Sequence, residues 1–290
     1  MKRQNKGFLI VILILLIGLI FPTTNWVKNN TKTLATQYNS KLSPIILIPG
    51  SSATINRFNE MVEKINKQSV RKHSLIKVEV STDGALHYEG EKLKGDNEPF
   101  IVVGFKNNKD GYDNILQQAK WFDIAFNDLQ KKYHFNHFKG IGHSNGGLIY
   151  TAFLEKYFKK YAEHIKITKL MTIGTPYNFF ETSINHETQM LADFIKNRRA
   201  IPKNLNVYSV MGTENYTSDG IVPEKSVEAG KYIYQKQVNH FTEITVTGSK
   251  AQHSALPQSE EIIDLITRYI MNRPKIKDKE IDNEKENNGD

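Results

Sequence analysis

The 290-residue chain contains no cysteine. This absence excludes disulfides, a catalytic thiolate and a lipid-modified cysteine behind an export signal. The chain also lacks a glycine-rich loop of the phosphate- or dinucleotide-binding kind, and it has no internal repeat. We therefore expect a protein that works without a cofactor.

A concentrated basic region is also missing, although the formal net charge is +8. Lys2, Arg3 and Lys6 precede an apolar run and fit a targeting segment, and the other lysines are scattered among acids. Because neither a basic helix nor an aromatic-basic repeat is present, we expect no nucleic-acid partner. The segment His134-Phe135-Asn136-His137 has no acidic third ligand at a zinc-protease spacing, so we predict no metal site.

The N-terminal segment, residues 1–27, has the layout of an export signal, because residues 8–21 are apolar apart from Gly18 and follow a positive start. This run is short for a membrane span of about 20 residues. The small-residue pattern Thr33-Leu34-Ala35 lies far beyond it, which favours a retained membrane anchor over a cleaved signal. We expect an exported protein that is either anchored at the cell surface or secreted.

Composition divides the rest of the chain into three parts. Residues 28–43 are expected to form a linker, residues 44–272 one catalytic domain, and residues 273–290 a disordered charged tail. We expect a monomer.

The order of apolar segments predicts an α/β fold. Strands are expected at 44–50, 75–80, 85–92, 100–105, 138–141, 167–173, 205–211 and 241–246. Helices are expected at 56–67, 113–132, 146–161, 226–234 and 259–271. Such alternation is typical of a mainly parallel sheet with helices on both faces. Residues 177–199 are long for a connection and are predicted to form a small lid.

The segment Gly142-His143-Ser144-Asn145-Gly146 lies between a predicted strand and a predicted helix. A serine hydroxyl needs a neighbouring base and a sharp turn that exposes Oγ, and glycines on both sides allow such a turn. The pattern alone is often only a glycine-rich turn, but the strand before it and the helix after it favour a nucleophile. We predict that Ser144 is the nucleophile.

If Ser144 is the nucleophile, the acid and then the histidine should follow it in the chain. His253 lies in the loop after the last predicted strand and is preferred as the base over His240, at that strand's edge. The acid is expected after residues 205–211, where Asp219 in a turn is preferred and Glu214 is the reserve. Taken alone, Asp219-Gly220 is an ordinary turn pair.

The oxyanion hole is expected to use two backbone N–H groups. One is that of Asn145, directly after the nucleophile, and the other comes from the loop after the first strand. There Gly50 allows the chain to turn so that Ser51, or alternatively Ser52, donates. A plain strand-terminating turn is the other interpretation of this loop.

The chain resembles the α/β-hydrolase superfamily, and within it a group of exported bacterial cell-surface hydrolases related to lipases and esterases. The resemblance spans residues 44–271 and is carried by five motifs in order, Ile48-Pro49-Gly50-Ser51-Ser52, Gly140-Ile141-Gly142-His143-Ser144-Asn145-Gly146-Gly147, Gly174-Thr175-Pro176-Tyr177-Asn178, Ser218-Asp219-Gly220-Ile221-Val222-Pro223 and Ala251-Gln252-His253-Ser254. Pro49 stands where the group usually has histidine, and Phe179 where a small residue often follows Thr-Pro. The resemblance implies esterase-like chemistry.

We therefore expect a serine hydrolase that cleaves a small-molecule or lipid-like carboxylic ester through an acyl-enzyme. Thioesterase, amidase or acyltransferase action on the same triad is one alternative. A catalytically silent cell-surface binding protein with the same fold is another.

Overall fold

The structure is a computed structural model that describes residues 4–214 and 216–271. The predicted tail at 273–290 lies outside the described residues, as do Lys2 and Arg3.

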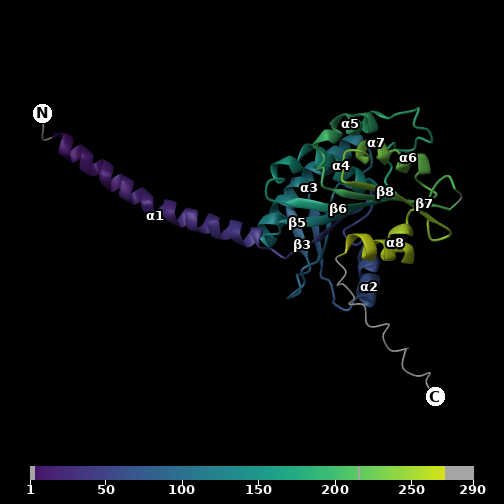
Figure 1. Cartoon of the computed structure of the whole chain (residues 1–290), viewed down its shortest axis with the longest axis horizontal. Coiled ribbons are helices and arrows are strands. Elements are labelled where there is room, and N and C mark those ends of the chain that lie inside the picture. Colours follow the sequence, from purple (N-terminus) through teal and green to yellow (C-terminus); the bar gives the residue numbers. More distant parts are fainter. Residues whose placement is uncertain (1–3, 215, 272–290) are drawn as a thin grey trace, which may run out of the picture.

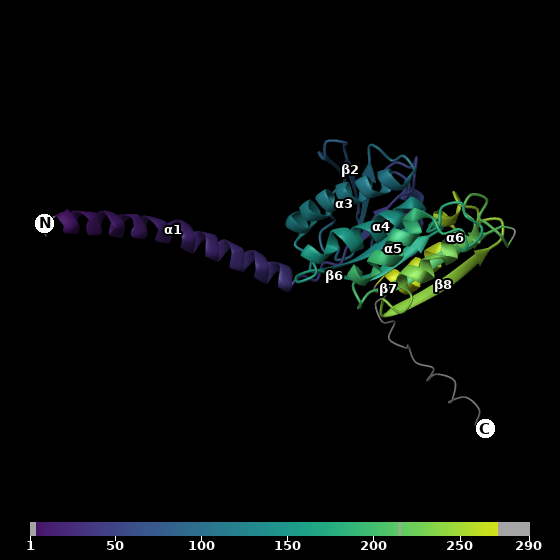
Figure 2. The same cartoon turned by 90° about the horizontal axis from the view of Figure 1, so that it is seen from above.

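The chain begins with one long helix, α1 (Gln4–Tyr38), which projects away from the domain in both Figure 1 and Figure 2. The segment 28–43, expected to be a linker, is helical up to Tyr38, and Gln37 near the end of the helix is buried against Phe135. Within residues 4–214 and 216–271, no helix combines the length and apolar character that crossing a membrane requires.

An eight-stranded sheet forms the centre of the domain, in the order β3-β2-β4-β1-β5-β6-β7-β8. The strands are β1 (Ile45–Ile48), β2 (Leu75–Val80), β3 (Leu86–Glu89), β4 (Phe100–Phe105), β5 (His137–His143), β6 (Lys166–Ile173), β7 (Asn206–Thr213) and β8 (His240–Thr247). Every neighbouring pair is parallel except β2 and β3. The predicted mainly parallel α/β sheet is confirmed, and each predicted strand is present.

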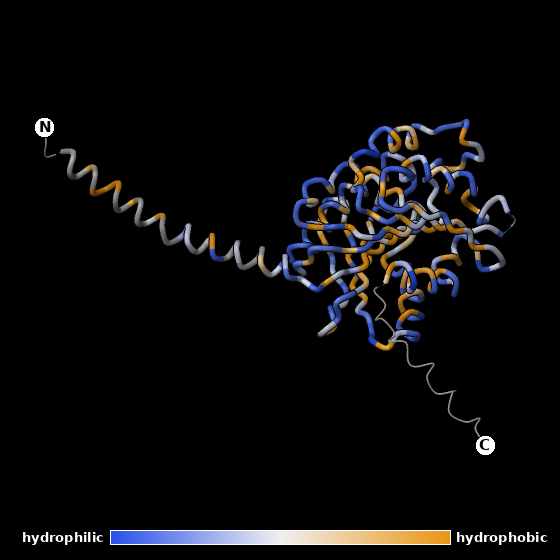
Figure 3. Tube along the Cα trace, viewed as in Figure 1, coloured by the Kyte–Doolittle hydropathy of each residue, from blue (hydrophilic) through white to orange (hydrophobic). Residues whose placement is uncertain are grey.

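Helices cover both faces of the sheet, as predicted. The helices of the domain are α2 (Asn59–Gln68), α3 (Tyr112–Tyr133), α4 (Asn145–Lys156), α5 (Gln189–Asn197), α6 (Glu224–Glu228), α7 (Gly230–Tyr234) and α8 (Glu260–Leu265). Ile46 and Ile48 of β1 point into a core with α3, α4, α5 and α7, whereas Ile45 and Leu47 point into a second core with α2 and α8. Figure 3 shows these apolar strands at the centre of the domain.

Three predicted helices end or break earlier than expected. The helix at 146–161 stops at Lys156 and is followed by a 3-10 turn, and that at 259–271 changes to a π-helical turn at Ile266. The helix at 226–234 is divided into α6 and α7. A Cβ on Gly230 would lie 2.6 Å from the Tyr177 ring, so the chain at this break fits only a residue without a side chain.

The predicted lid at 177–199 has two different parts. Its second half is α5, whose Met190, Leu191 and Phe194 are buried in the main core. Its first part lies beside a cavity, which Phe179 and Phe180 line. Only this first part is therefore in a position to cover a bound molecule.

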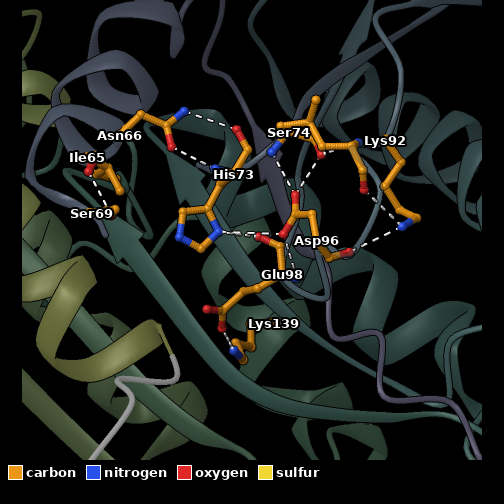
Figure 4. A network of polar contacts seen from close by, with 10 residues as sticks. Ile65, Asn66, Ser69, His73, Ser74, Lys92, Asp96, Glu98 and Lys139 are labelled. Atoms are coloured by element: carbon orange, nitrogen blue, oxygen red, sulfur yellow. Dashed lines mark hydrogen bonds and ion pairs between the residues drawn. The ribbon is translucent and has the colours of Figure 1, made fainter. Parts of the chain in front are cut away.

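A buried polar network joins the start of the central strands (Figure 4). Asp96 accepts hydrogen bonds from the Ser74 N–H, the Ser74 hydroxyl and the Glu98 N–H, at 2.6 to 2.9 Å. Glu98 pairs with the buried Lys139 of β5, and His73 Nδ1 lies 3.7 Å from Asp96. Burial alone would raise the pKa of Asp96, but the nearby His73 imidazole and the hydrogen bonds from Ser74 and the Glu98 N–H outweigh it and lower the pKa to about 2.

This network predicts a specific loss of stability in acid. Since the folded-state pKa of Asp96 is about 2, below its ordinary 3.8, the carboxylate stabilises the fold above pH 3.8, and this contribution is lost as the pH falls toward 2. Asp96→Asn should therefore be less stable than the wild type at pH 6, and the difference should shrink by about 1–2 kcal/mol by pH 2.

Urea unfolding followed by circular dichroism between pH 6 and pH 2 measures both proteins. Glu91→Gln, at an exposed acid, is the matched control and should keep a constant difference from the wild type. If the free energies of unfolding of Asp96→Asn and the wild type changed in parallel with pH, Asp96 would not be the source of the pH-dependent stability.

Candidate active site

Ser144 occupies a strained turn between β5 and α4. Its φ of 54° and ψ of −127° lie in a region that non-glycine residues rarely adopt. The turn is possible because glycines flank it: a Cβ on Gly146 would lie 2.0 Å from the Ile48 carbonyl oxygen, and one on Gly142 would lie 2.5 Å from the Gly147 nitrogen. The flanking glycines therefore allow the sharp strand-to-helix turn that carries Ser144.

His253 and Asp219 form a buried pair beside this turn. His253 Nδ1 lies 2.6 Å from Asp219 Oδ2, and the His253 N–H donates to the Asp219 carbonyl at 2.8 Å. The second carboxylate oxygen accepts from the N–H groups of Ile221 and Val222 at 3.1 and 2.7 Å. Asp219 is only 1 % exposed, so its orientation is fixed from both sides.

The two less-favoured candidates lie elsewhere. His240 is exposed at the start of β8, the opposite end of the strand from the loop that carries His253. Glu214 is exposed near Gly220 and makes no hydrogen bond to His253 among the described residues. Of the predicted groups, the structure brings together Ser144, Asp219 and His253.

All three segments meet at one cavity of about 460 Å³, which Ser144 and His253 both line. Within the described residues no hydrogen bond joins Ser144 Oγ to His253 Nε2. Such catalytic hydrogen bonds are often long in ligand-free proteins and shorten when a substrate binds. The cavity also has an apolar side, formed by Pro176, Phe179, Phe180, Ile221 and Val222.

Two of the three N–H groups proposed for the oxyanion hole have no hydrogen-bond partner among the described residues, namely those of Ser51 and Asn145. The Ser52 N–H instead donates to the Asn108 carbonyl at 3.0 Å. This bond engages Ser52, so of the two serines only Ser51 has an N–H available to a ligand. Gly50 packs directly on the nucleophile, because a Cβ there would lie 2.6 Å from Ser144 Cβ.

The loop after β4 holds the two segments that carry the Ser51 and Asn145 N–H groups. These contacts were not predicted from the sequence. Asn108 Nδ2 donates to the Ala53 carbonyl at 2.8 Å, and Asn145 Nδ2 donates to Asp110 Oδ1 at 2.7 Å. Gln118, buried in α3, supports the loop by donating to two of its carbonyls at 3.0 Å. None of these residues has a local sequence pattern that marks it, since each contact joins segments far apart in the chain.

His143 is a second residue that the sequence analysis left without a role. Its ring lies 4.8 Å from that of His253, and its Nε2 lies 3.1 Å from the His253 carbonyl. Burial, followed by the charges of His253 and Arg57, lowers the pKa of His143 well below its usual value. The ring is therefore neutral, and its Nε2–H donates to the backbone that carries His253.

Gly174 leaves space for the contact between Asp219 and His253. A Cβ on Gly174, which has a φ of 56°, would lie 3.0 Å from Asp219 Oδ2 and 3.1 Å from His253 Nδ1. In the sequence, Gly174 is visible only as the start of a Gly-Thr-Pro motif. In the structure, its missing side chain makes room for the His253–Asp219 pair.

The mainly parallel sheet, the strained Ser144 turn after β5, and Asp219 and His253 after β7 and β8 form the arrangement of an α/β hydrolase. The chain belongs to the family described as alpha/beta hydrolase of unknown function (DUF915), which matches residues 32–273. A search of curated proteins found no match.

Two solved structures resemble the chain closely. One is a protein of Lactobacillus plantarum WCFS1 described as a cell surface hydrolase, with 51 % identity and a TM-score of 0.74 over 81 % of this chain and 94 % of that one. The other is a gene product of Listeria innocua, with 26 % identity and a TM-score of 0.72 over 81 % of this chain and 96 % of that one.

Proposed function

We propose that the protein hydrolyses carboxylic esters with Ser144 as nucleophile, His253 as base and Asp219 as the group that orients the base. The observation that carries the proposal is the 2.6 Å contact between His253 Nδ1 and Asp219 Oδ2 in a histidine that lines the same cavity as the strained Ser144. This arrangement fits the requirements of a serine nucleophile, a base and an orienting acid.

The proposed reaction has two steps. Ser144 Oγ attacks the ester carbonyl carbon while His253 Nε2 accepts the hydroxyl proton, and the negative oxygen that forms accepts from the N–H groups of Ser51 and Asn145. His253 then gives the proton to the leaving alcohol oxygen. Water repeats the sequence on the acyl-enzyme, which releases the acid and restores Ser144.

Other acyl transfers can use the same groups, so thioesters, amides and a second alcohol as acceptor are alternative substrates. The apolar side of the cavity, with Phe179 and Phe180, supports an acyl chain with hydrocarbon character. The alternative outside the enzymes is a catalytically silent binding protein. In such a protein, Ser144 would not react with a serine-directed probe.

The first prediction concerns Ser144. Ser144→Ala should lower kcat on short-chain p-nitrophenyl esters by about 10⁴-fold or more, because no other group can form the acyl-enzyme. A fluorophosphonate probe should label the wild type and not the variant, as read by intact-protein mass spectrometry. Full turnover by Ser144→Ala would disprove the assignment, and an inert Ser144 in folded wild-type protein would favour the binding protein.

The second prediction concerns Asp219. Asp219→Asn keeps the side-chain shape but removes the charge that holds Nδ1–H and stabilises the imidazolium, so kcat should fall by about 10³–10⁴-fold. Glu214→Gln, in the same loop, is the matched control and should retain kcat close to that of the wild type. If the two variants exchanged these results, Glu214 would be the acid.

We also propose that the protein acts outside the cytoplasm, in keeping with the apolar N-terminal segment and with the relative described as a cell surface hydrolase. Protease added to intact cells whose wall has been removed should digest the catalytic domain, while a cytoplasmic marker stays intact. Fractionation then shows whether the domain remains with the membrane or is released. Protection of the domain in the intact cells would place it in the cytoplasm.

A further inference from the structure

Arg57 places a cation on the wall of the reactive cavity. The residue precedes α2 and is partly buried. Its Nη1 donates to Gln258 Oε1 at 3.0 Å and its Nη2 to the Ser254 carbonyl at 2.6 Å. Both partners are neutral, and no ion pair to Arg57 exists among the described residues. The other three of its five N–H groups have no hydrogen-bond partner among the described residues.

The neighbouring charged groups do not neutralise Arg57. Burial lowers the pKa of Arg57 and the charge of Glu60 opposes this, but an arginine remains protonated at neutral pH. Glu60 itself pairs with Lys64 at 3.2 Å. Asp110, the carboxylate on the cavity wall, accepts from the Asn145 side chain and the Gly111 N–H instead. His143 is neutral, so the charged side chains that line the cavity are Arg57 and Asp110, and within the described residues neither forms an ion pair.

The position of Arg57 indicates which portion of a bound ester would lie beside the guanidinium. Arg57 binds the carbonyl of Ser254, the residue that follows His253. In the proposed reaction, His253 gives its proton to the leaving alcohol oxygen, so the leaving group must lie beside His253. The guanidinium is therefore on the leaving-group side of the cavity.

We propose that Arg57 forms a subsite for an anionic group, a carboxylate or a phosphate, on the alcohol portion of the ester. The inference rests on the proposed ester hydrolysis and names its substrate class. A planar guanidinium binds either anion through paired hydrogen bonds, and a partly buried cation without a carboxylate partner favours such a ligand. The products are then a free acid and an alcohol that carries the anion.

The test compares three esters that differ in the presence and the position of a carboxylate. 4-(Butyryloxy)benzoate carries a carboxylate on the leaving group, 4-(butyryloxy)benzamide is its neutral analogue, and the succinate half-ester of 4-hydroxybenzamide carries the carboxylate on the acyl side. The wild type should show the highest kcat/KM on the first. In Arg57→Gln, the ratio of kcat/KM between the first and second esters should fall about tenfold, the usual size of one charge-assisted hydrogen bond.

Two further variants separate binding of the anion from support of the His253 loop. Arg57→Lys keeps the charge and should keep most of the preference. Gln258→Ala removes a neutral partner of Arg57 and should leave the ratio unchanged. If Arg57→Gln and Gln258→Ala lowered both rates equally, Arg57 would only clamp the loop, and the inference would be wrong. A preference for the acyl-side carboxylate would also overturn it.

A binding measurement covers the case in which no ester is turned over. Phenyl phosphate should raise the melting temperature of the wild type and of Arg57→Lys, but not that of Arg57→Gln, while phenol should raise none of them. With an inactive wild type, this result would keep the anion subsite and reject ester hydrolysis. Equal shifts in all three proteins, or no shift, would reject the subsite.

Discussion

The close packing of backbone around Ser144 is the constraint on which the rest of the site depends. The residue adopts a φ of 54° because β5 must turn directly into α4. That turn brings Gly146 so near to the end of β1 that a Cβ would meet the Ile48 carbonyl oxygen at 2.0 Å. The loop after β1 then lies on the nucleophile through Gly50. The serine, the N-terminus of α4 and the Ser51 N–H are therefore positioned by one set of contacts, and none of the three can move alone.

The residues proposed as acid and base reach this turn from the other half of the sheet. Asp219 follows β7 and His253 follows β8, two strands that are paired along their whole length. Parallel strands end at the same edge of the sheet, which is why a mainly parallel topology brings together residues that are far apart in the sequence. Gly174 after β6 completes the arrangement, because its missing side chain leaves room for both partners.

Much of this could be predicted from the sequence, because the relevant signals are local. Strand patterns, the glycines around Ser144 and the loop positions of Asp219 and His253 are visible in short windows. The roles of Asn108 and His143 were not predictable, since a single hydrogen bond across the fold leaves no periodic trace. The break between α6 and α7 was missed for the same reason, as it depends on the Tyr177 ring beside Gly230.

The charges at the cavity relate His143 to Arg57. In the proposed reaction, His253 becomes a cation when it accepts the Ser144 proton, and the buried Asp219 carboxylate balances this charge. A second cation within 5 Å would oppose this step, since two charges at that distance interact strongly in a poorly solvated site. His143 lies 4.8 Å away and is kept neutral by burial. Arg57 cannot be neutralised in this way, because a guanidinium does not lose its proton. A substrate anion bound to Arg57 would offset its charge at the moment when the imidazolium forms, so in our proposal the same group that selects the substrate also favours proton transfer to His253.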